Sequence, residues 1–413
     1  MDTGNLGKQD IYDRIVIGAG ASGLFFAAGD SSPGRKLILE KTPRPGQKLL
    51  MTGNGMCNIT HAGSVKDFVG KYGGNGKLIR TLLYKHSNIE LTTFMESLGV
   101  PLTEREDGKV FPSSMKAAGV LSALLERAEQ NGWEIRTGAE VTEISAAGTE
   151  APGRSGEPAG QVRILLADGK QYSAKKLVIS TGGKSYPTTG SDGTFFNVLE
   201  RDLGLMITPL HPALAPVYVQ DYGFSDLSGI SVPDAVIRCG GFASRGPVLL
   251  THRGFSGPAV LRISEHVRPG DEMVLDFLPD MSTEDVLAKL LHDQPGNSQG
   301  AANYAASLFG LPKALVSRLL EDPQKKLSSL TGKELSVMAE KLKGSRFSVS
   351  GTGGWGDAMV TAGGVALDQA DLKTMELKGH PGICVIGEAL DINGDTGGYN
   401  LQFAYSSAMA AIG

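Results

Sequence analysis

The chain has 413 residues, which is enough for two or three domains of about 150 residues each. Apolar residues make up 41% and charged residues 20%, as in ordinary soluble globular proteins. The net charge of −4 excludes a strongly basic nucleic-acid surface as the main feature. The longest apolar stretch, residues 15–28, is shorter than the ~20 residues of a membrane-spanning helix. We therefore expect a cytoplasmic protein with no nucleic-acid partner and no membrane insertion.

Glycine and cysteine are used in informative ways. There are 56 glycines, about twice the usual share of ~7%, and they gather at the ends of predicted strands, where the backbone must approach something closely. Cys57, Cys239 and Cys384 lie far apart in the sequence, which argues against a disulfide framework, a zinc site and a dithiol pair. The histidines show no metal-ligand spacing, so no metal site is predicted.

The N-terminal part of the chain predicts a strand–helix–strand unit. After a polar tail, residues 1–10, which we expect to be mobile, residues 11–17 have the composition of a short buried strand. A glycine-rich turn at residues 18–23 leads into an apolar helix, and a second strand, residues 36–40, ends in Glu40. This order is typical of a βαβ unit.

The middle of the chain mixes helices and strands. Apolar residues recur at helical spacing in residues 76–99 and 117–131. Residues 133–144 and 161–166 alternate like antiparallel strands on either side of a Gly- and Pro-rich segment, 148–160, which we expect to be an exposed loop. Residues 177–179 predict a further buried strand.

The composition changes again in the C-terminal half. Residues 209–278 are β-branched and punctuated by proline, which predicts a small antiparallel β domain, and residues 282–342 have leucines at helical spacing. Residues 382–387 predict one more buried strand, and a helix over residues 401–412 follows. The first and last segments therefore form one domain that is interrupted by a β insert and a helical insert.

The turn at residues 18–23 has the G-x-G-x-x-G pattern between a predicted strand and a predicted helix. Gly18 permits a tight turn, Gly20 lets the backbone approach a pyrophosphate, and Gly23 lets the helix pack closely on the sheet. Glu40 can accept hydrogen bonds from ribose hydroxyls and would repel the 2′-phosphate of NADP. The alternative interpretation is a structural glycine turn with a solvated Glu40.

The cofactor that fits best is FAD, because three predicted strands end in glycine-bearing segments that can line a ligand longer than NAD. These segments are residues 18–23, 181–183 and 387–388, and a polar loop at residues 48–58 follows Glu40 directly. No dedicated nicotinamide domain is predicted, so NAD(P)H would dock transiently as a co-substrate.

Several segments carry a resemblance to a known family. They are residues 18–23 with Glu40, 52–58, 108–112 (GKVFP), 180–187 (STGGKSYP), 251–260 (THRGFSGPAV), 361–365 (TAGGV) and 387–402 (GEALDINGDTGGYNLQ). The chain resembles the NAD(P)/FAD-dependent oxidoreductase flavoprotein family that includes aminoacetone oxidase and a bile-acid-pathway flavoprotein. The resemblance implies an α/β fold, with a Rossmann-like, glutathione-reductase-like FAD-binding domain of the ββα type, an inserted β-barrel-like domain and a helical domain.

The implied domain boundaries and FAD contacts follow from the same resemblance. The FAD-binding domain would comprise residues 1–200 and 346–413, the β insert 201–280 and the helical insert 281–345. The residues expected around the ADP half of a non-covalent FAD are Gly18, Gly20, Ala21, Ser22, Gly23, Glu40, Lys41 and Val141, the last through its backbone. Those expected nearer the pyrophosphate and the flavin are Lys48, Thr52, Gly53, Asn54, Asn58, Thr181, Gly182, Gly183, Gly387, Glu388, Gly398, Asn400 and Leu401.

The candidate catalytic residues each have a structural alternative. Cys57 is either a redox thiol or a small packed residue. His252 is either an acid–base group or a residue that holds a loop of the β domain. Tyr399 is either a proton donor or an aromatic residue packed under the last helix. Met56 stands where the family loop usually carries arginine, which leaves any inherited substrate preference open.

The sequence therefore predicts an FAD-dependent oxidoreductase that transfers hydride between the flavin and a small-molecule substrate or NAD(P)H. The flavin carries this chemistry, so few reactive side chains are needed. Two alternatives stay open: an O₂-using flavin oxidase of a small amine and a non-catalytic flavin-binding sensor. A flavoprotein that acts on tRNA would need a basic face, which the net charge does not favour. The oligomeric state is left open.

Overall fold

The computed structural model describes residues 10–146 and 161–413. The other residues of the expected tail and the expected loop at 148–160 lie outside the described residues, whereas Asp10 already belongs to strand β1. The chain forms two compact units. Unit 1 contains the described residues up to His211 and those from Val360 to Gly413, and unit 2 contains Pro212–Met359.

Unit 1 is built on a seven-stranded sheet in which five neighbouring strands run parallel. In spatial order they are β6 (Trp133–Thr137), β2 (Lys36–Glu40), β1 (Asp10–Ile17), β9 (Gln171–Ile179) and β18 (Ile383–Val385). All residues of β2 and β18 are buried, as expected for parallel strands that are covered on both faces. The carboxyl ends of these strands lie along one edge of the sheet.

Strand β9 uses one edge for two partners. Its last residues pair in parallel with β18, and its first residues pair antiparallel with β8 (Val162–Leu166), which in turn pairs with β7 (Val141–Ala146). The expectation of one antiparallel strand over residues 133–144 is wrong. The chain turns at Gly138, whose φ is +67°, so that β6 pairs in parallel with β2 and only β7 is antiparallel.

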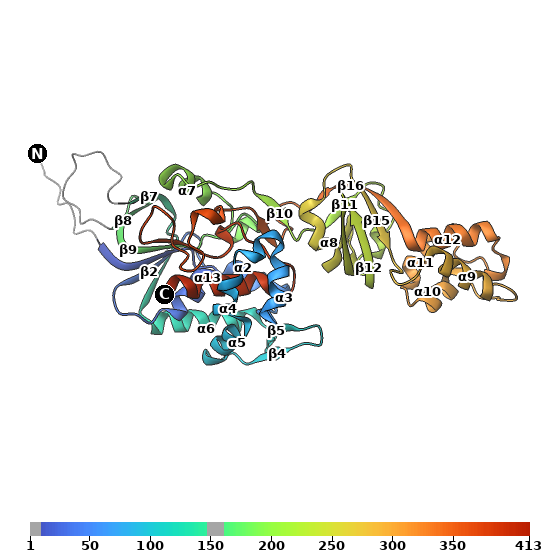
Figure 1. Cartoon of the computed structure of the whole chain (residues 1–413), viewed down its shortest axis with the longest axis horizontal. Helices are drawn as coiled ribbons and strands as arrows, with labels where there is room; N and C mark the ends of the chain where they lie inside the picture. Colours follow the sequence, from blue (N-terminus) through green and yellow to red (C-terminus); the bar gives the residue numbers. More distant parts are fainter. Residues whose placement is uncertain (1–9, 147–160) are drawn as a thin grey trace, which may run out of the picture. The chain divides into compact units, whose positions relative to one another are not determined.

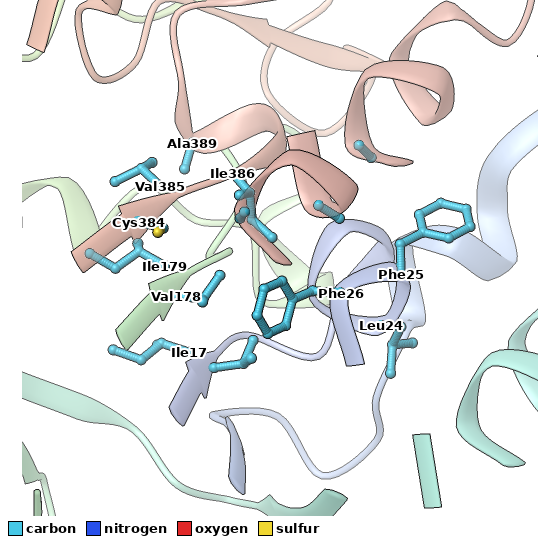
Figure 2. Packing of buried hydrophobic residues seen from close by; sticks show 14 of the residues in the cluster. Ile17, Leu24, Phe25, Phe26, Val178, Ile179, Cys384, Val385, Ile386 and Ala389 are labelled. Atoms are coloured by element: carbon cyan, nitrogen blue, oxygen red, sulfur yellow. The ribbon is translucent and has the colours of Figure 1, made fainter. Parts of the chain in front are cut away.

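Two helices pack together against this sheet. They are α1 (Ala21–Gly29) and α13 (Tyr399–Ile412), and the ring of Phe25 meets the ring of Tyr405 edge-on at a centroid distance of 5.5 Å. Figure 2 shows Phe26 of α1 among the buried side chains of the sheet, including Ile17 and Val178. The core of unit 1 therefore fixes α1 directly behind the end of β1.

The remaining elements of unit 1 surround the sheet. The helices are α2 (Gln47–Met51), α3 (Val65–Val69), α4 (Arg80–Lys85), α5 (Asn88–Ser97), α6 (Ala117–Gln130) and α7 (Phe195–Leu203). A small sheet has the order β3 (Thr60–His61), β5 (Lys109–Pro112), β4 (Leu102–Glu104). The short strands β10 (His211–Ala213) and β17 (Val360–Ala362) stand where the chain passes from one unit to the other.

Unit 2 combines a closed six-stranded barrel with helices (Figure 1). Around the barrel the strands are β11 (Val217–Val219), β14 (Gly254–Ser256), β13 (Phe242–Leu250), β12 (Ser231–Cys239), β15 (Glu272–Asp276) and β16 (Ser345–Thr352). The helices are α8 (Pro258–Ile263), α9 (Thr283–Asp293), α10 (Ala301–Phe309), α11 (Lys313–Leu319) and α12 (Gly332–Gly344). Barrel and helices share one hydrophobic core.

Strand β16 differs from the sequence-based boundaries. The sequence analysis assigns residues from 346 onward to the FAD-binding domain, but residues 345–352 close the barrel by pairing with β15 and β11. The buried positions Ser345 and Val349 lie among exposed and half-buried neighbours, as expected of a barrel wall with one face to the core. Among the described residues, no helix is long and apolar enough to cross a membrane.

The packing of β2 leads to a stability prediction. Ile38 is fully buried in the sheet, whereas Ile89 on α5 is 70% exposed. We expect Ile38→Ala to destabilise unit 1 by about 2–5 kcal/mol, because the truncation leaves a cavity in a close-packed core. Urea unfolding followed by Trp133 fluorescence in a Trp355→Phe background measures this, because the chain has two tryptophans. Ile89→Ala is the matched control, and equal losses for both variants would contradict the assigned core.

Candidate cofactor-binding site

The glycine turn joins β1 to α1 by an unusually close backbone approach. Gly18 has a φ of +98°, and a Cβ there would lie 2.6 Å from the carbonyl oxygen of Ser180. A Cβ on Gly23 would collide with the carbonyl oxygen of Gly18. Helix α1 therefore begins immediately beside the ends of β1 and β9, as the close-packing roles of these two glycines predict.

The N-terminus of α1 offers an open cradle. Its N-cap residue, Gly20, forms no side-chain cap, and a Cβ built on Gly20 meets no atom within 4 Å. Ala21 and Ser22 follow in the first turn, where backbone N–H groups have no partner inside the helix. Free N–H groups, a positive dipole end and open space beside the backbone together fit a pyrophosphate.

Glu40 lies next to this cradle at the end of β2 and is 8% exposed. One carboxylate oxygen accepts a hydrogen bond from the Ala19 N–H at 2.8 Å, and the other accepts from the N–H and the hydroxyl of Thr42, each at 2.8 Å. A carboxylate offers about four lone-pair sites, so Glu40 retains capacity for a ribose hydroxyl. The structure thus holds the carboxylate against the glycine turn, and Glu40 is not simply solvated.

A polar network links the other strand ends to the segment that follows β2. Lys48 of α2 donates to Glu388 at 2.6 Å and also to the hydroxyl of Ser185, which in turn donates to Glu388 at 3.1 Å. The backbone N–H of Thr361 donates to the same carboxylate at 2.7 Å. Lys48 and Glu388 side chains are about one-fifth exposed, at 23% and 21%, so the pair is only partly desolvated.

Lys48 and Glu388 are predicted from the sequence, whereas Ser185 and Thr361 are not. The Thr361 hydroxyl accepts hydrogen bonds from the backbone N–H groups of Lys184 and Ser185, at 2.7 and 3.1 Å. It therefore holds the loop after β9 against strand β17. Both residues lie inside quoted motifs, STGGKSYP and TAGGV, and this placement was the one signal available in the sequence.

The loop at residues 52–58 has a strained backbone. Asn54 and Cys57 have φ values of +56° and +62°, a region that is uncommon for residues with a side chain. The Thr52 hydroxyl donates to the Leu49 carbonyl oxygen at 2.7 Å. In the orientation that satisfies its neighbours, the Asn58 amide accepts from the Gly398 N–H at 3.1 Å and so ties the loop to the start of α13.

The other expected FAD contacts lie at the carboxyl edge of the sheet in unit 1 or in elements next to that edge. Lys41 pairs with Asp192 at 2.7 Å. Val141 is the first residue of β7, where it is opposite Leu166. The remaining expected residues lie in loops after β9 and β18 or at the start of α13; they are Thr181, Gly182, Gly183, Gly387, Gly398, Asn400 and Leu401. The side-chain amide of Asn400, in the first turn of α13, forms two hydrogen bonds with the backbone of Gly394 in the preceding loop, each at 2.8 Å.

The catalytic candidates differ in their surroundings. Cys57 is fully buried, and burial raises the pKa of its thiol to about 11. Tyr399 is 5% exposed and packs against the rings of His61 and Phe68. His252 belongs to unit 2 and is exposed in the turn between β13 and β14. The described residues contain no cluster of His, Cys, Asp and Glu suited to a metal ion.

A second G-x-G-x-x-G match occurs at residues 351–356. It begins within the last two residues of β16, an antiparallel barrel strand, and no helix begins directly after it. The pattern at residues 18–23 is therefore distinguished by its strand–turn–helix context rather than by its glycines.

The chain matches known proteins over nearly its full length. Residues 12–412 match the family model described as the HI0933-like protein Rossmann domain. The chain is 31% identical to the ribosomal RNA dihydrouridine synthase of Escherichia coli (strain K12), with 97% of this chain and 96% of that protein covered. It is 30% identical to the 3-dehydro-bile acid delta(4,6)-reductase of Clostridium scindens, with 96% and 97% covered.

The fold also resembles solved structures. A variant of the E. coli quinol fumarate reductase FrdA aligns with a TM-score of 0.50 at 15% identity, over 98% of this chain and 70% of that chain. At this identity the likeness concerns the fold alone. The predicted fold class and the predicted family resemblance are confirmed.

The two glycines of the turn lead to opposite predictions. We expect Gly20→Ala to fold normally but to retain FAD at least about tenfold more weakly, because the added methyl group occupies the cradle and not the protein core. Gly23→Ala is expected to lower the thermal stability of unit 1 itself, because its methyl group collides with the backbone. Flavin content after gel filtration and thermal unfolding measure the two effects. Wild-type flavin retention by Gly20→Ala would remove the cradle from the cofactor site.

The raised pKa of Cys57 predicts an unreactive thiol. At pH 7 the thiol is protonated, and the reactive thiolate accumulates only as the pH approaches about 11. We expect iodoacetamide at pH 7 to leave Cys57 unmodified in the folded protein, as judged by peptide mass spectrometry, and all three cysteines to react in urea. Rapid alkylation of Cys57 in the folded state would instead support a redox thiol.

Proposed function

Because the chain belongs to the HI0933-like Rossmann family, we propose that it is an FAD-dependent oxidoreductase that reduces a carbon–carbon double bond conjugated with a carbonyl group. One observation carries the cofactor assignment: the uncapped start of α1, the Glu40 carboxylate at the end of β2 and the Lys48–Glu388 network all lie at the carboxyl ends of the parallel strands. This edge is where doubly wound α/β folds bind nucleotides.

Different residues of this edge would bind different parts of FAD. The first turn of α1 would receive the pyrophosphate, and Glu40 would accept the ribose hydroxyls of the ADP half. Glu388, which is held by Lys48 and Thr361, would orient the segment between pyrophosphate and flavin. Helix α13 starts at Gly398 without a side-chain cap, and its positive end would favour negative charge on the reduced ring. When bound, FAD supplies hydride exchange with the substrate.

The choice of substrate bond rests on the names of two relatives. A dihydrouridine synthase adds two hydrogens to a ring double bond that is conjugated with a carbonyl group. A delta(4,6)-reductase of a 3-dehydro-bile acid acts on ring double bonds conjugated with a ketone. The substrates differ, but the bond type is common to both, so we assign that bond type to this chain.

The electron donor in this proposal is NADH or NADPH, docked transiently. The described residues place no thiol pair near the site, since the three cysteines are separate and buried, so no dithiol relay is involved and the nicotinamide would reduce the flavin directly. RNA is the less favoured substrate because the net charge of −4 does not supply the cationic surface that phosphate backbones require.

The proposal predicts a specific order of colour changes. We expect the purified yellow protein to lose its flavin absorbance on anaerobic addition of NADH or NADPH, and to regain it when a conjugated enone is added, because the enone accepts the hydride. Stopped-flow absorbance measures both steps. A saturated ketone of the same skeleton is the matched control and should leave the flavin reduced.

Other outcomes separate the alternatives. Bleaching by a small amine, with recovery on admission of O₂, would indicate the amine oxidase. A flavin that no donor reduces would indicate the sensor. A colourless protein that takes up no added FAD would overturn the proposal altogether. A uridine-containing ribosomal RNA fragment that reoxidises the flavin while enones do not would move the substrate to RNA.

A further inference from the structure

The hairpin of β4 and β5 holds one arginine against the cofactor loop. The Arg105 guanidinium lies over the ring of Phe111, 4.2 Å from its centroid. One of its terminal nitrogens is 3.5 Å from the sulfur of Met56 and 3.8 Å from the sulfur of Met115. Phe111 is buried and both methionines are half-buried. The guanidinium therefore packs on an apolar surface formed by Phe111, Met56 and Met115, which we call the seat.

The positive charge of Arg105 has no direct ion-pair partner among the described residues and is compensated only at longer range, by the Asp107 carboxylate of the same hairpin. Among residues 10–146 and 161–413, no carboxylate forms an ion pair with it. Its neighbours Glu104 and Glu106 are exposed. Asp107 forms its ion pair with Lys109, and the hydrogen bonds from Lys109, together with the more distant charge of Arg105, lower the pKa of the Asp107 carboxyl. Thioether sulfur is a weak hydrogen-bond acceptor, so the contacts with the methionines orient the guanidinium without satisfying its donors.

The seat is continuous with the predicted flavin-facing loop. An atom of the Phe111 ring lies 3.3 Å from the position that a Cβ on Gly53 would take, and Met56 belongs to the same loop. Gly53 and Asn54 are exposed and both have left-handed backbone conformations. Arg105 therefore lies beside the exposed surface of the loop that is expected to face the flavin, next to the side chain of Met56.

We propose that Arg105 binds a carboxylate or phosphate group of the substrate and so orients the bond to be reduced; this rests on the proposed function. The planar guanidinium presents a fork of donors that matches either anion. The stacking on Phe111 pre-organises the fork, which reduces the ordering cost of binding. A bile acid carries a carboxylate and an RNA carries phosphates, so the named substrates of both relatives contain such a group.

Paired probes test the role of Arg105 in the flavin-loaded protein. One pair is a 3-oxo-4-ene steroid carboxylic acid and its methyl ester, and the other is uridine 5′-monophosphate and uridine. For the pair that binds, we expect Arg105→Ala to weaken binding of the anionic member about tenfold or more, to leave the neutral member unchanged, and to abolish the preference between them. Arg105→Lys should restore part of the preference, because it keeps the charge without the fork.

A matched control is available on α4. Arg80 is also an exposed arginine over an aromatic ring, 5.6 Å from the centroid of Tyr84. Arg80→Ala should leave binding of both members unchanged, while removing the same charge from unit 1. Unchanged flavin content in each variant shows that the fold and the cofactor are intact. Equal losses from Arg80→Ala and Arg105→Ala, or no loss from Arg105→Ala, would overturn the assignment.

A second measurement does not depend on the identity of the substrate. Phenylglyoxal modifies accessible guanidinium groups, and inorganic phosphate should slow modification of Arg105 more than that of Arg80, as measured by peptide mass spectrometry. If the probes neither bind nor react but phosphate protects Arg105, the proposed reaction fails and the anion site stands. If phosphate protects neither arginine, the anion site is refuted, whatever the reaction proves to be.

Discussion

The backbone contact between the glycine turn and the end of β9 is the constraint on which unit 1 depends. At Gly18 and Gly23 there is no room for a side chain, because the Gly18 and Ser180 carbonyl oxygens occupy that space. The contact brings α1 against the sheet, points its uncapped N-terminus at the carboxyl edge, and leaves Gly20 facing open space. The close backbone contact of Gly18 and Gly23 on one side of the turn thus leaves the open cradle at Gly20 on the other side.

The remaining strand ends are joined by polar side chains instead of close packing. Glu388 receives hydrogen bonds from Lys48 of helix α2, Ser185 of the loop after β9 and the backbone of Thr361 in strand β17. A partly exposed ion pair of this kind contributes little to stability by itself. Its effect is geometric, since one carboxylate in the segment after β18 fixes the relative positions of helix α2, the loop after β9 and strand β17.

A positive charge lies next to the loop at residues 52–58. A methionine occupies position 56 of the loop, and the guanidinium reaches the same place from a hairpin some fifty residues further along the chain. Phe111 connects the two, because its ring contacts the loop at Gly53 and carries Arg105. Aromatic stacking keeps an arginine ordered without a carboxylate partner, which leaves its hydrogen-bond donors available to a ligand.

Local pattern determined much of this protein. The strand–turn–helix context of residues 18–23, the acid at Glu40 and the apolar runs of β1, β2, β9 and β18 predicted a βαβ unit and further buried strands, because these features depend on neighbouring residues and on backbone sterics. The Rossmann-like domain as a whole was implied by the family resemblance. Most of the predicted cofactor residues fall at one sheet edge for the same reason: parallel strands place their carboxyl ends together.

Only the tertiary structure decided which distant residues meet. Ser185, Thr361 and Arg105 have no local signature, since a serine, a threonine or an arginine in a loop is compatible with many partners. The sequence also could not separate β6 from β7 or assign β16 to the barrel, because strand pairing depends on which edge is free after the sheet assembles. Those outcomes follow from long-range register and packing, which the periodicity of a short segment does not predict.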